Sequence, residues 1–128
     1  MSKKVLIIDD DFDLVEAMRV TLEAADFDVI DAQDGNRGLE LIRKEHPDLV
    51  LLDVMMAQID EGFHVAYQIR SDESIKDTPI VILTAVGTQT GFHFDPSKDE
   101  DFLPVDAYLE KPVNPKKLVD VVRQHIKV

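Results

Sequence analysis

Residues 5–11 read Val5-Leu6-Ile7-Ile8-Asp9-Asp10-Asp11, four branched aliphatic residues followed directly by three aspartates. Such an aliphatic run is typical of a strand buried on both faces, as in a parallel sheet. Its end brings several negative charges to one place, and partly buried carboxylates are costly unless they are paired or bind a cation. Carboxylate oxygens suit Mg²⁺. The alternative is a helix N-cap, which explains one aspartate but not three.

The composition is that of one folded domain. The chain has 128 residues, of which 45% are hydrophobic, and this is enough for a single core. Its net charge is −12 with no run of lysine or arginine, so we expect no direct binding of nucleic acid. The chain has no cysteine, which excludes disulfides and thiol chemistry. The apolar run near the N-terminus is too short for a signal peptide or a membrane span, so we expect a cytoplasmic protein.

Short apolar runs alternate with helical patterns along the chain. The expected strands are residues 5–8, 27–30, 49–52, 80–83 and 107–109, and the expected helices are residues 14–25, 35–45, 62–70 and a last one from 115. His46-Pro47 ends the second helix, and Asn114-Pro115 starts the last one as an N-cap with proline at its first position. This alternation predicts an α/β fold with a doubly wound, five-stranded parallel sheet and helices on both faces.

The segment between Ala85 and Asp106 interrupts this alternation. It contains two glycines, two prolines and three of the six phenylalanines, and it shows no clean helical period. We therefore expect an irregular fourth-helix region whose phenylalanines cover a face of the sheet. The alternative is an exposed patch that docks a partner.

Polar residues follow four of the five expected strands. Asp9 and Asp10 follow the first strand, Asp53 the third, Thr84 the fourth and Lys111 the fifth. In an open parallel sheet, ligands bind beyond the carboxyl ends of the strands, at the point where the strand order reverses. The sequence therefore predicts that acids, a hydroxyl and an ammonium group share one rim of the sheet.

This arrangement resembles the receiver domain of two-component response regulators, in the chemotaxis-receiver-like, single-domain form. The resemblance covers essentially the whole chain. Four motifs carry it, namely Ile8-Asp9-Asp10-Asp11, Leu51-Leu52-Asp53-Val54-Met55-Met56, Leu83-Thr84-Ala85 and Asp106-Ala107-Tyr108-Leu109-Glu110-Lys111-Pro112. It implies the flavodoxin-like strand order 2-1-3-4-5, with residues 1–128 as one receiver domain and no output domain visible.

The resemblance implies that Asp53 is the phosphoacceptor. A carboxylate is already ionised at neutral pH, so this nucleophile needs no general base. The resemblance also implies that Mg²⁺ is held by Asp10, Asp53 and the backbone carbonyl of Met55. Asp9 would lie beside the metal and act partly through its waters. Asp11 is expected to cap the first helix.

The resemblance also implies roles for the other site residues. Lys111 would pair with the phosphoacceptor at rest and with a phosphoryl oxygen afterwards, aimed by a cis bond to Pro112. Thr84 would donate its hydroxyl to the phosphoryl group, and Ala85 would leave room for that group. Tyr108 would follow Thr84 inward in a switch between two conformations. On the residue types alone, Thr84 and Tyr108 are also ordinary strand residues, and Lys111 is also an ordinary surface lysine.

The family implies signalling partners rather than substrates. A histidine kinase or phosphotransfer protein would supply the phosphoryl group, a downstream protein would be the target, and a phosphorylation-dependent dimer is one form of output. The domain would be no enzyme beyond its own phosphorylation and dephosphorylation. The chain departs from the family at Ala57, where proline is usual, at Glu61, which looks like an extra residue, and in the long segment after Ala85. We therefore expect this chain to share the site chemistry of the family, but we do not expect it to share the family's usual output surface.

Two other functions stay open as alternatives. Asp9-x-Asp11 resembles the motif of haloacid dehalogenase-like phosphatases, but Asp13 stands where threonine or valine is usual, and the chain is short for that fold. Turnover of a phosphate ester would identify such an enzyme. The second alternative is a receiver-fold binding module that phosphate does not switch, which the intact acids, hydroxyl and ammonium group disfavour. A calcium loop at 95–106 is weaker, because Glu100 stands where an EF-hand needs glycine.

Overall fold

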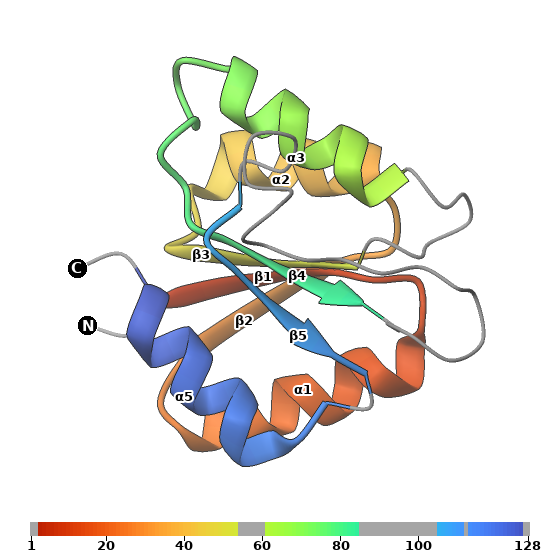
Figure 1. Cartoon of the computed structure of the whole chain (residues 1–128), viewed down its shortest axis with the longest axis vertical. Helices are drawn as coiled ribbons and strands as arrows, with labels where there is room; N and C mark the ends of the chain where they lie inside the picture. The colour runs from red at the N-terminus through yellow and green to blue at the C-terminus, as the bar shows by residue number, and fades with distance from the viewer. Residues whose placement is uncertain (1–2, 54–60, 85–104, 112, 127–128) are drawn as a thin grey trace.

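A computed structural model describes residues 3–53, 61–84, 105–111 and 113–126, and for residues 61–63 and 84 it describes the backbone alone (Figure 1). The elements in chain order are β1 Lys4–Ile8, α1 Phe12–Ala24, β2 Asp28–Ala32, α2 Gly35–Glu45, β3 Leu49–Asp53, α3 Glu61–Ser71, β4 Ile80–Thr84, β5 Ala107–Glu110 and α5 Pro115–His125. The predicted irregular fourth-helix region lies, over residues 85–104, outside the described residues.

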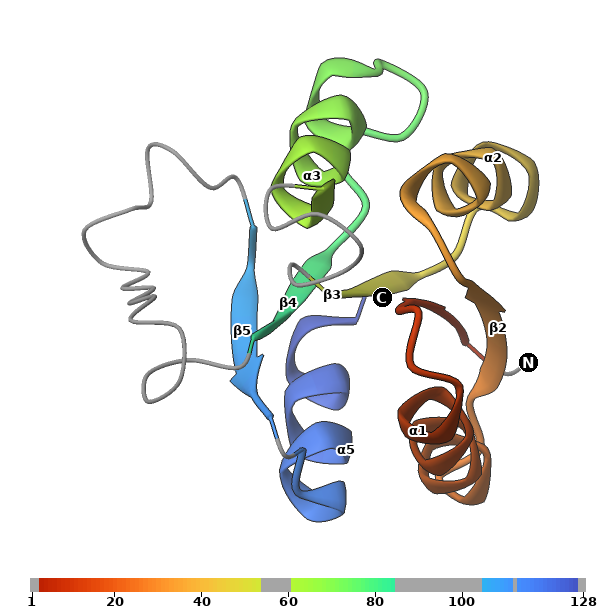
Figure 2. The same ribbon diagram turned by 90° about the vertical axis from the view of Figure 1, so that its right-hand side faces the viewer.

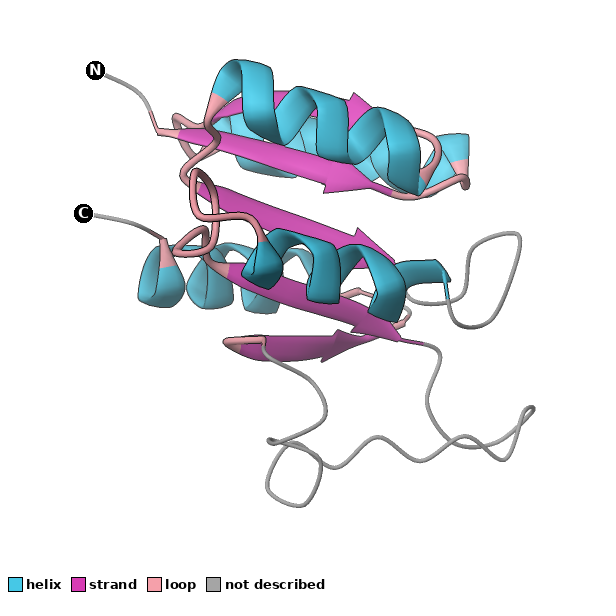
Figure 3. Ribbon diagram, turned by 90° about the horizontal axis from the view of Figure 1, so that it is seen from above, coloured by secondary structure: helices cyan, strands magenta, loops and turns pink. Residues whose placement is uncertain are grey.

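The five strands form one parallel sheet in the order β2-β1-β3-β4-β5, which confirms the predicted topology. Figure 3 shows the strand arrows pointing the same way. Ile8 pairs with Leu52 across β1 and β3, and Thr84 pairs with Glu110 across β4 and β5. The carboxyl ends of the central strands therefore lie at one edge, where the sequence placed its polar residues.

The sheet is covered on both faces, with α2 and α3 on one face and α1 and α5 on the other (Figure 2). Successive side chains of a strand point to opposite faces. Leu6 and Ile8 of β1 thus enter the α2/α3-side core, while Val5 and Ile7 enter the α1/α5-side core, and all four are fully buried. Each such side chain contributes roughly 1.5–3 kcal/mol through burial. The aliphatic run therefore serves two cores at once.

The helix ends follow the predicted capping residues. Asp11 is the N-cap of α1 and accepts the N–H of Leu14 at 3.2 Å, as expected. Asn114 caps α5 with Pro115 after it, and His46 ends α2 in the left-handed conformation at φ 48°. Within the described residues, no helix is long and apolar enough to cross a membrane.

The start of β2 differs from the prediction by one residue because α1 ends in a Schellman motif. The N–H of Phe27 bonds to Leu22 O and the N–H of Asp26 bonds to Glu23 O, both at 3.0 Å, with Asp26 left-handed at φ 72°. Phe27 consequently buries its ring in the α1/α5-side core, and β2 starts at Asp28. The strand also runs two residues further than predicted, to Ala32.

Gly38 sets how closely α2 approaches β1. A Cβ atom at this position would lie 2.4 Å from Cδ1 and 2.8 Å from Cγ1 of Ile8. We expect Gly38→Ala to lower the free energy of unfolding by about 1–3 kcal/mol, because overpacking a dense core forces side chains to shift. Urea unfolding measures this loss. Ile8→Val removes the Cδ1 atom, so Gly38→Ala should cost less in that background, and an equal cost in both would contradict the steric cause.

Candidate functional site

Two buried aspartates lie side by side at the carboxyl edge of the sheet. Asp9 directly follows β1, and Asp53 is the last residue of β3. Each is only 1% exposed, although both are acids. Pairing of Ile8 with Leu52 brings the next residues of the two strands together. The aliphatic strands that build the core therefore deliver two carboxylates into a place where charge is costly.

Lys111 lies between these carboxylates. It follows β5, and its Nζ is 3.2 Å from Oδ2 of Asp9 and 3.2 Å from Oδ2 of Asp53, with its side chain 20% exposed. Oδ1 of Asp9 accepts the N–H of Asp11 at 2.9 Å. Within the described residues, Oδ2 of Asp9 accepts no aligned hydrogen bond, so its contact with the ammonium is ionic. One cation is thus shared between two buried anions.

A third carboxylate completes the acidic cluster. One side-chain oxygen each from Asp9, Asp10 and Asp53 lies within 4.8 Å of the others, and Asp10 is exposed to solvent. When all are ionised, three carboxylates and the Lys111 ammonium leave a formal charge of −2. Hard oxygen donors with this charge, one of them open to solvent, suit a divalent cation that keeps part of its water shell. The cluster could therefore hold Mg²⁺.

The electrostatics of Asp9 support this conclusion. Burial raises the pKa of Asp9 above its ordinary 3.8, and the charge of Asp53 adds to the rise. The N–H of Asp11 and the ammonium of Lys111 act in the opposite direction. A raised pKa means that the folded protein holds this proton more tightly than the unfolded chain does. Stability therefore falls as pH rises through the pKa of Asp9 in the folded state, unless a cation compensates.

Asp9→Asn should stabilise the fold at neutral pH without Mg²⁺. The amide keeps an acceptor for the N–H of Asp11 but removes a buried charge. We expect the free energy of unfolding to rise by on the order of 1 kcal/mol. The gain should shrink in acid, where the wild-type carboxyl is protonated. Urea unfolding across pH measures this, with Asp28→Asn, at the exposed first residue of β2, as the matched control. An equal or lower stability of Asp9→Asn at pH 7 would contradict the argument.

The remaining predicted site residues are placed in part. Thr84 ends β4 at the same edge as Asp53, where the backbone alone is described. Tyr108 of β5 is half-buried and packs against the α2/α3-side core. Met55, Ala85 and Pro112, and with Pro112 the predicted cis bond, lie outside the described residues.

Sequence reasoning paired Lys111 with Asp53 alone and missed its equal contact with Asp9. A signal for this was present in the sequence. Asp9 directly continues a run buried on both faces, so its carboxylate is buried with the strand and needs a cation within reach. The water-mediated role predicted for Asp9 remains a prediction.

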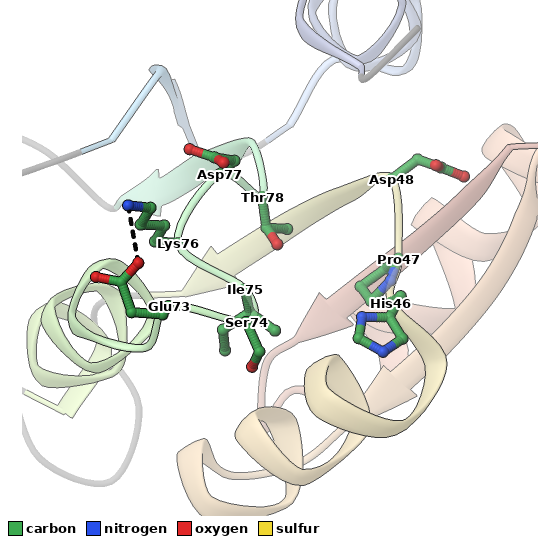
Figure 4. Close-up of a pocket in the computed structure, with 9 residues that line it drawn as sticks. All are labelled: His46, Pro47, Asp48, Glu73, Ser74, Ile75, Lys76, Asp77 and Thr78. Carbon is green, nitrogen blue, oxygen red and sulfur yellow. Dashed lines mark ion pairs between the residues drawn. The ribbon is translucent and has the colours of Figure 1, made fainter.

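A separate cavity of about 260 Å³ lies at the opposite edge of the sheet (Figure 4). It is lined by His46–Asp48, before β3, and by residues 73–78, before β4. Among its charged groups, Glu73 pairs with Lys76 at 3.0 Å, and Oδ2 of Asp48 accepts the N–H of Lys4 at 2.8 Å. This cavity is therefore not part of the acidic site.

Comparisons with known proteins agree with this geometry. A family described as response regulator receiver domain matches residues 5–123. The alkaline phosphatase synthesis transcriptional regulatory protein PhoP of Bacillus subtilis is 35% identical over 125 residues, covering 92% of this chain and 46% of PhoP. The DNA-binding dual master transcriptional regulator RpaA of Synechocystis is 37% identical over 122 residues, covering 94% of this chain and 47% of RpaA. The chain thus spans about half the length of these relatives.

Solved structures match nearly the whole chain. The chemotaxis response regulator CheY4 of Vibrio cholerae has a TM-score of 0.82 at 28% identity, covering 97% of this chain and 98% of CheY4. The BeF3-activated N-terminal receiver domain of Klebsiella pneumoniae RstA has a TM-score of 0.79 at 27% identity, covering 96% of this chain and 97% of that domain.

Proposed function

The chain belongs to the response regulator receiver family, and on this premise we propose that Asp53 accepts a phosphoryl group from a phosphohistidine partner in the presence of Mg²⁺. The observation that carries the proposal is the position of the Asp53 carboxylate. It is 1% exposed, 3.2 Å from the Lys111 ammonium and within the acidic cluster that could hold a divalent cation. A positioned carboxylate nucleophile, with an ammonium beside it and acids that could hold a divalent cation, provides the charge neutralisation that phosphoryl transfer requires.

In this mechanism an Oδ atom of Asp53 attacks phosphorus, and the bond from phosphorus to the histidine nitrogen of the partner breaks. The electron pair leaves with the imidazole, which takes up a proton. Lys111 moves from the two carboxylates to a phosphoryl oxygen and offsets the transferred charge. Asp10, Asp53 and the carbonyl of Met55 would hold Mg²⁺, with Asp9 beside it. The bound ion would neutralise charge on the phosphoryl oxygens.

The signal would leave the site through Thr84 and Tyr108. The hydroxyl of Thr84 would donate to the phosphoryl group, for which Ala85 leaves room. Tyr108 lies two residues before Glu110, the β5 partner of Thr84, and its half-buried ring packs against the core. In the proposed switch this ring would move between two positions. Phosphorylation would shift the population between these positions and so change the contacts of the domain.

Partners follow from the family. A histidine kinase or phosphotransfer protein would be the donor, and a downstream protein, or a second phosphorylated copy, would receive the signal. Residues 1–128 would form one receiver domain that acts in the cytoplasm and makes no direct contact with nucleic acid. As a receiver it is a signalling module, and it would consume phosphodonor only through Asp53.

Incubation with acetyl phosphate and Mg²⁺, followed by intact mass spectrometry, tests the proposal. The protein should gain the mass of one phosphoryl group, and a chelator added beforehand should prevent the gain. No gain would overturn the proposal and favour the receiver-fold module that phosphate does not switch. Continued turnover of a phosphate ester in excess of the protein would instead favour the haloacid dehalogenase-like alternative.

A further inference from the structure

A polar network joins α3 to the start of β5, at the edge of the sheet opposite the acidic site. Nη1 of Arg70 donates to the carbonyls of Lys76 and Thr78 at 2.7 and 2.6 Å. Nη2 of the same residue donates to Oδ2 of Asp106 at 3.0 Å. Asp106 bonds both backbone groups of Ile80, since its N–H donates to Ile80 O at 2.9 Å and its Oδ2 accepts the N–H of Ile80 at 2.8 Å.

This network is the feature that ties β5 to one register. β5 has four residues. In the described part of the chain it is the outermost strand of the sheet and pairs with β4 alone (Figure 2). Its apolar pattern is weak, because Leu109 is buried while Ala107 and Tyr108 are both half-buried. A strand without a clear inner and outer face specifies its register poorly.

Asp106 fixes the register of β5, which the apolar pattern of the strand leaves poorly specified. A slip of one residue would place Val105 or Ala107 opposite Ile80, and neither side chain can accept its N–H or pair with Arg70. The two hydrogen bonds that Oδ2 of Asp106 accepts, from the N–H of Ile80 and from Nη2 of Arg70, therefore hold only in the observed register. A lysine could not replace Arg70, because its single ammonium lacks the planar fork that reaches two carbonyls and a carboxylate.

The register of β5 in turn fixes the position of Lys111. Pairing of Thr84 with Glu110 leaves Lys111 as the next residue, at the rim. A strand rises about 3.3 Å per residue, so a slip of one residue moves Lys111 by as much as its 3.2 Å contacts with Asp9 and Asp53. Such a displacement removes the cation from both carboxylates.

We propose that Arg70 and Asp106 are positioning residues for Lys111, setting the register of β5 from the edge opposite the site. The inference rests on the proposed function for its consequence, since a misplaced Lys111 cannot neutralise the transferred phosphoryl group. Small errors in placement carry large rate penalties, about tenfold or more. Arg70→Met and Asp106→Ala should therefore slow phosphorylation by acetyl phosphate about tenfold, under conditions where urea unfolding shows the variants to be folded.

Arg43→Met is the matched control. It breaks an ion pair of similar length, 2.9 Å from Arg43 to Asp72, which joins α2 to the end of α3 without touching β5. We expect its phosphorylation rate to equal that of the wild type. Arg70→Lys should behave as Arg70→Met does. Equal rates in Arg70→Met, Asp106→Ala and wild type would overturn the proposal.

A double-variant experiment separates positioning from general stability. In a Lys111→Met background, Arg70→Met should cause no further loss of the residual rate, because there is no ammonium left to misplace. An additional tenfold loss there would overturn the proposal. The side-chain ¹⁵N signal of Lys111, assigned by its absence in Lys111→Met, should shift in Arg70→Met but not in Arg43→Met. This signal requires no phosphorylation, so an unchanged shift refutes the positioning role, whereas a wild type that gains no phosphoryl mass refutes the proposed function.

Discussion

Asp53→Asn should abolish phosphoryl acceptance completely. The amide occupies the same volume in a site where Asp53 is 1% exposed, so the fold is expected to survive. Its oxygen carries no full charge and is a poor nucleophile. The ammonium of Lys111 would still lie 3.2 Å from Asp9, so the neighbouring charges remain. Intact mass after incubation with acetyl phosphate and Mg²⁺ should therefore show no gain, against a full phosphoryl gain in the wild type.

The matched control for this prediction is Asp28→Asn, an identical change at the exposed first residue of β2. It should be phosphorylated as the wild type is. A mass gain in Asp53→Asn equal to that of the wild type would place the phosphoacceptor elsewhere in the chain. Loss of the gain in Asp28→Asn would mean that the assay reports overall charge rather than the site.

The sequence was sufficient to predict the sheet and its rim because both depend on burial. Four aliphatic residues in a row leave no polar face, so β1 and β3 had to be central strands of a parallel sheet. Once the strands are parallel, whatever follows them meets at one edge. Burial and strand direction therefore predict that Asp9, Asp53 and Lys111 lie at this edge, where Nζ of Lys111 is 3.2 Å from both carboxylates.

Local backbone conformation was harder to predict. The apolar pattern predicts that Phe27 begins a strand with Asp28-Val29-Ile30, yet its N–H bonds to Leu22 O in the C-terminal cap of α1. The deciding feature is the left-handed conformation of Asp26, which turns the N–H of Phe27 toward Leu22. A glycine at this position would have predicted the left-handed turn, whereas an aspartate predicts it only weakly.

The division of charge within the site was also beyond sequence reasoning. Whether Lys111 contacts one carboxylate or two depends on strand twist and register at the scale of an ångström. The structure places Nζ at 3.2 Å from each acid. Apolar periodicity cannot supply this detail, and the register of β5 is set by polar groups at its other end.

Mg²⁺ should stabilise the fold against unfolding, and this effect should depend on Asp10. Without the ion, the three carboxylates near Lys111 carry a net charge of −2 in a partly buried place. The folded cluster binds the ion and the unfolded chain does not, so at a hundred times the dissociation constant the free energy of unfolding should rise by about 2.7 kcal/mol. Thermal unfolding across a Mg²⁺ series measures this, at constant ionic strength so that screening is held fixed.

Asp10→Asn should remove most of this stabilisation, because Asp10 supplies the solvent-exposed oxygen of the cluster, through which a hydrated ion can be bound. Asp13→Asn is the matched control, since Asp13 is also exposed and lies in the first turn of α1, outside the cluster. Its melting temperature should rise with Mg²⁺ as in the wild type. If Asp10→Asn gained as much stability from Mg²⁺ as the wild type, the ion would be bound without Asp10. If Asp13→Asn lost the gain as well, the effect of Mg²⁺ would come from the net charge of −12 rather than from a site.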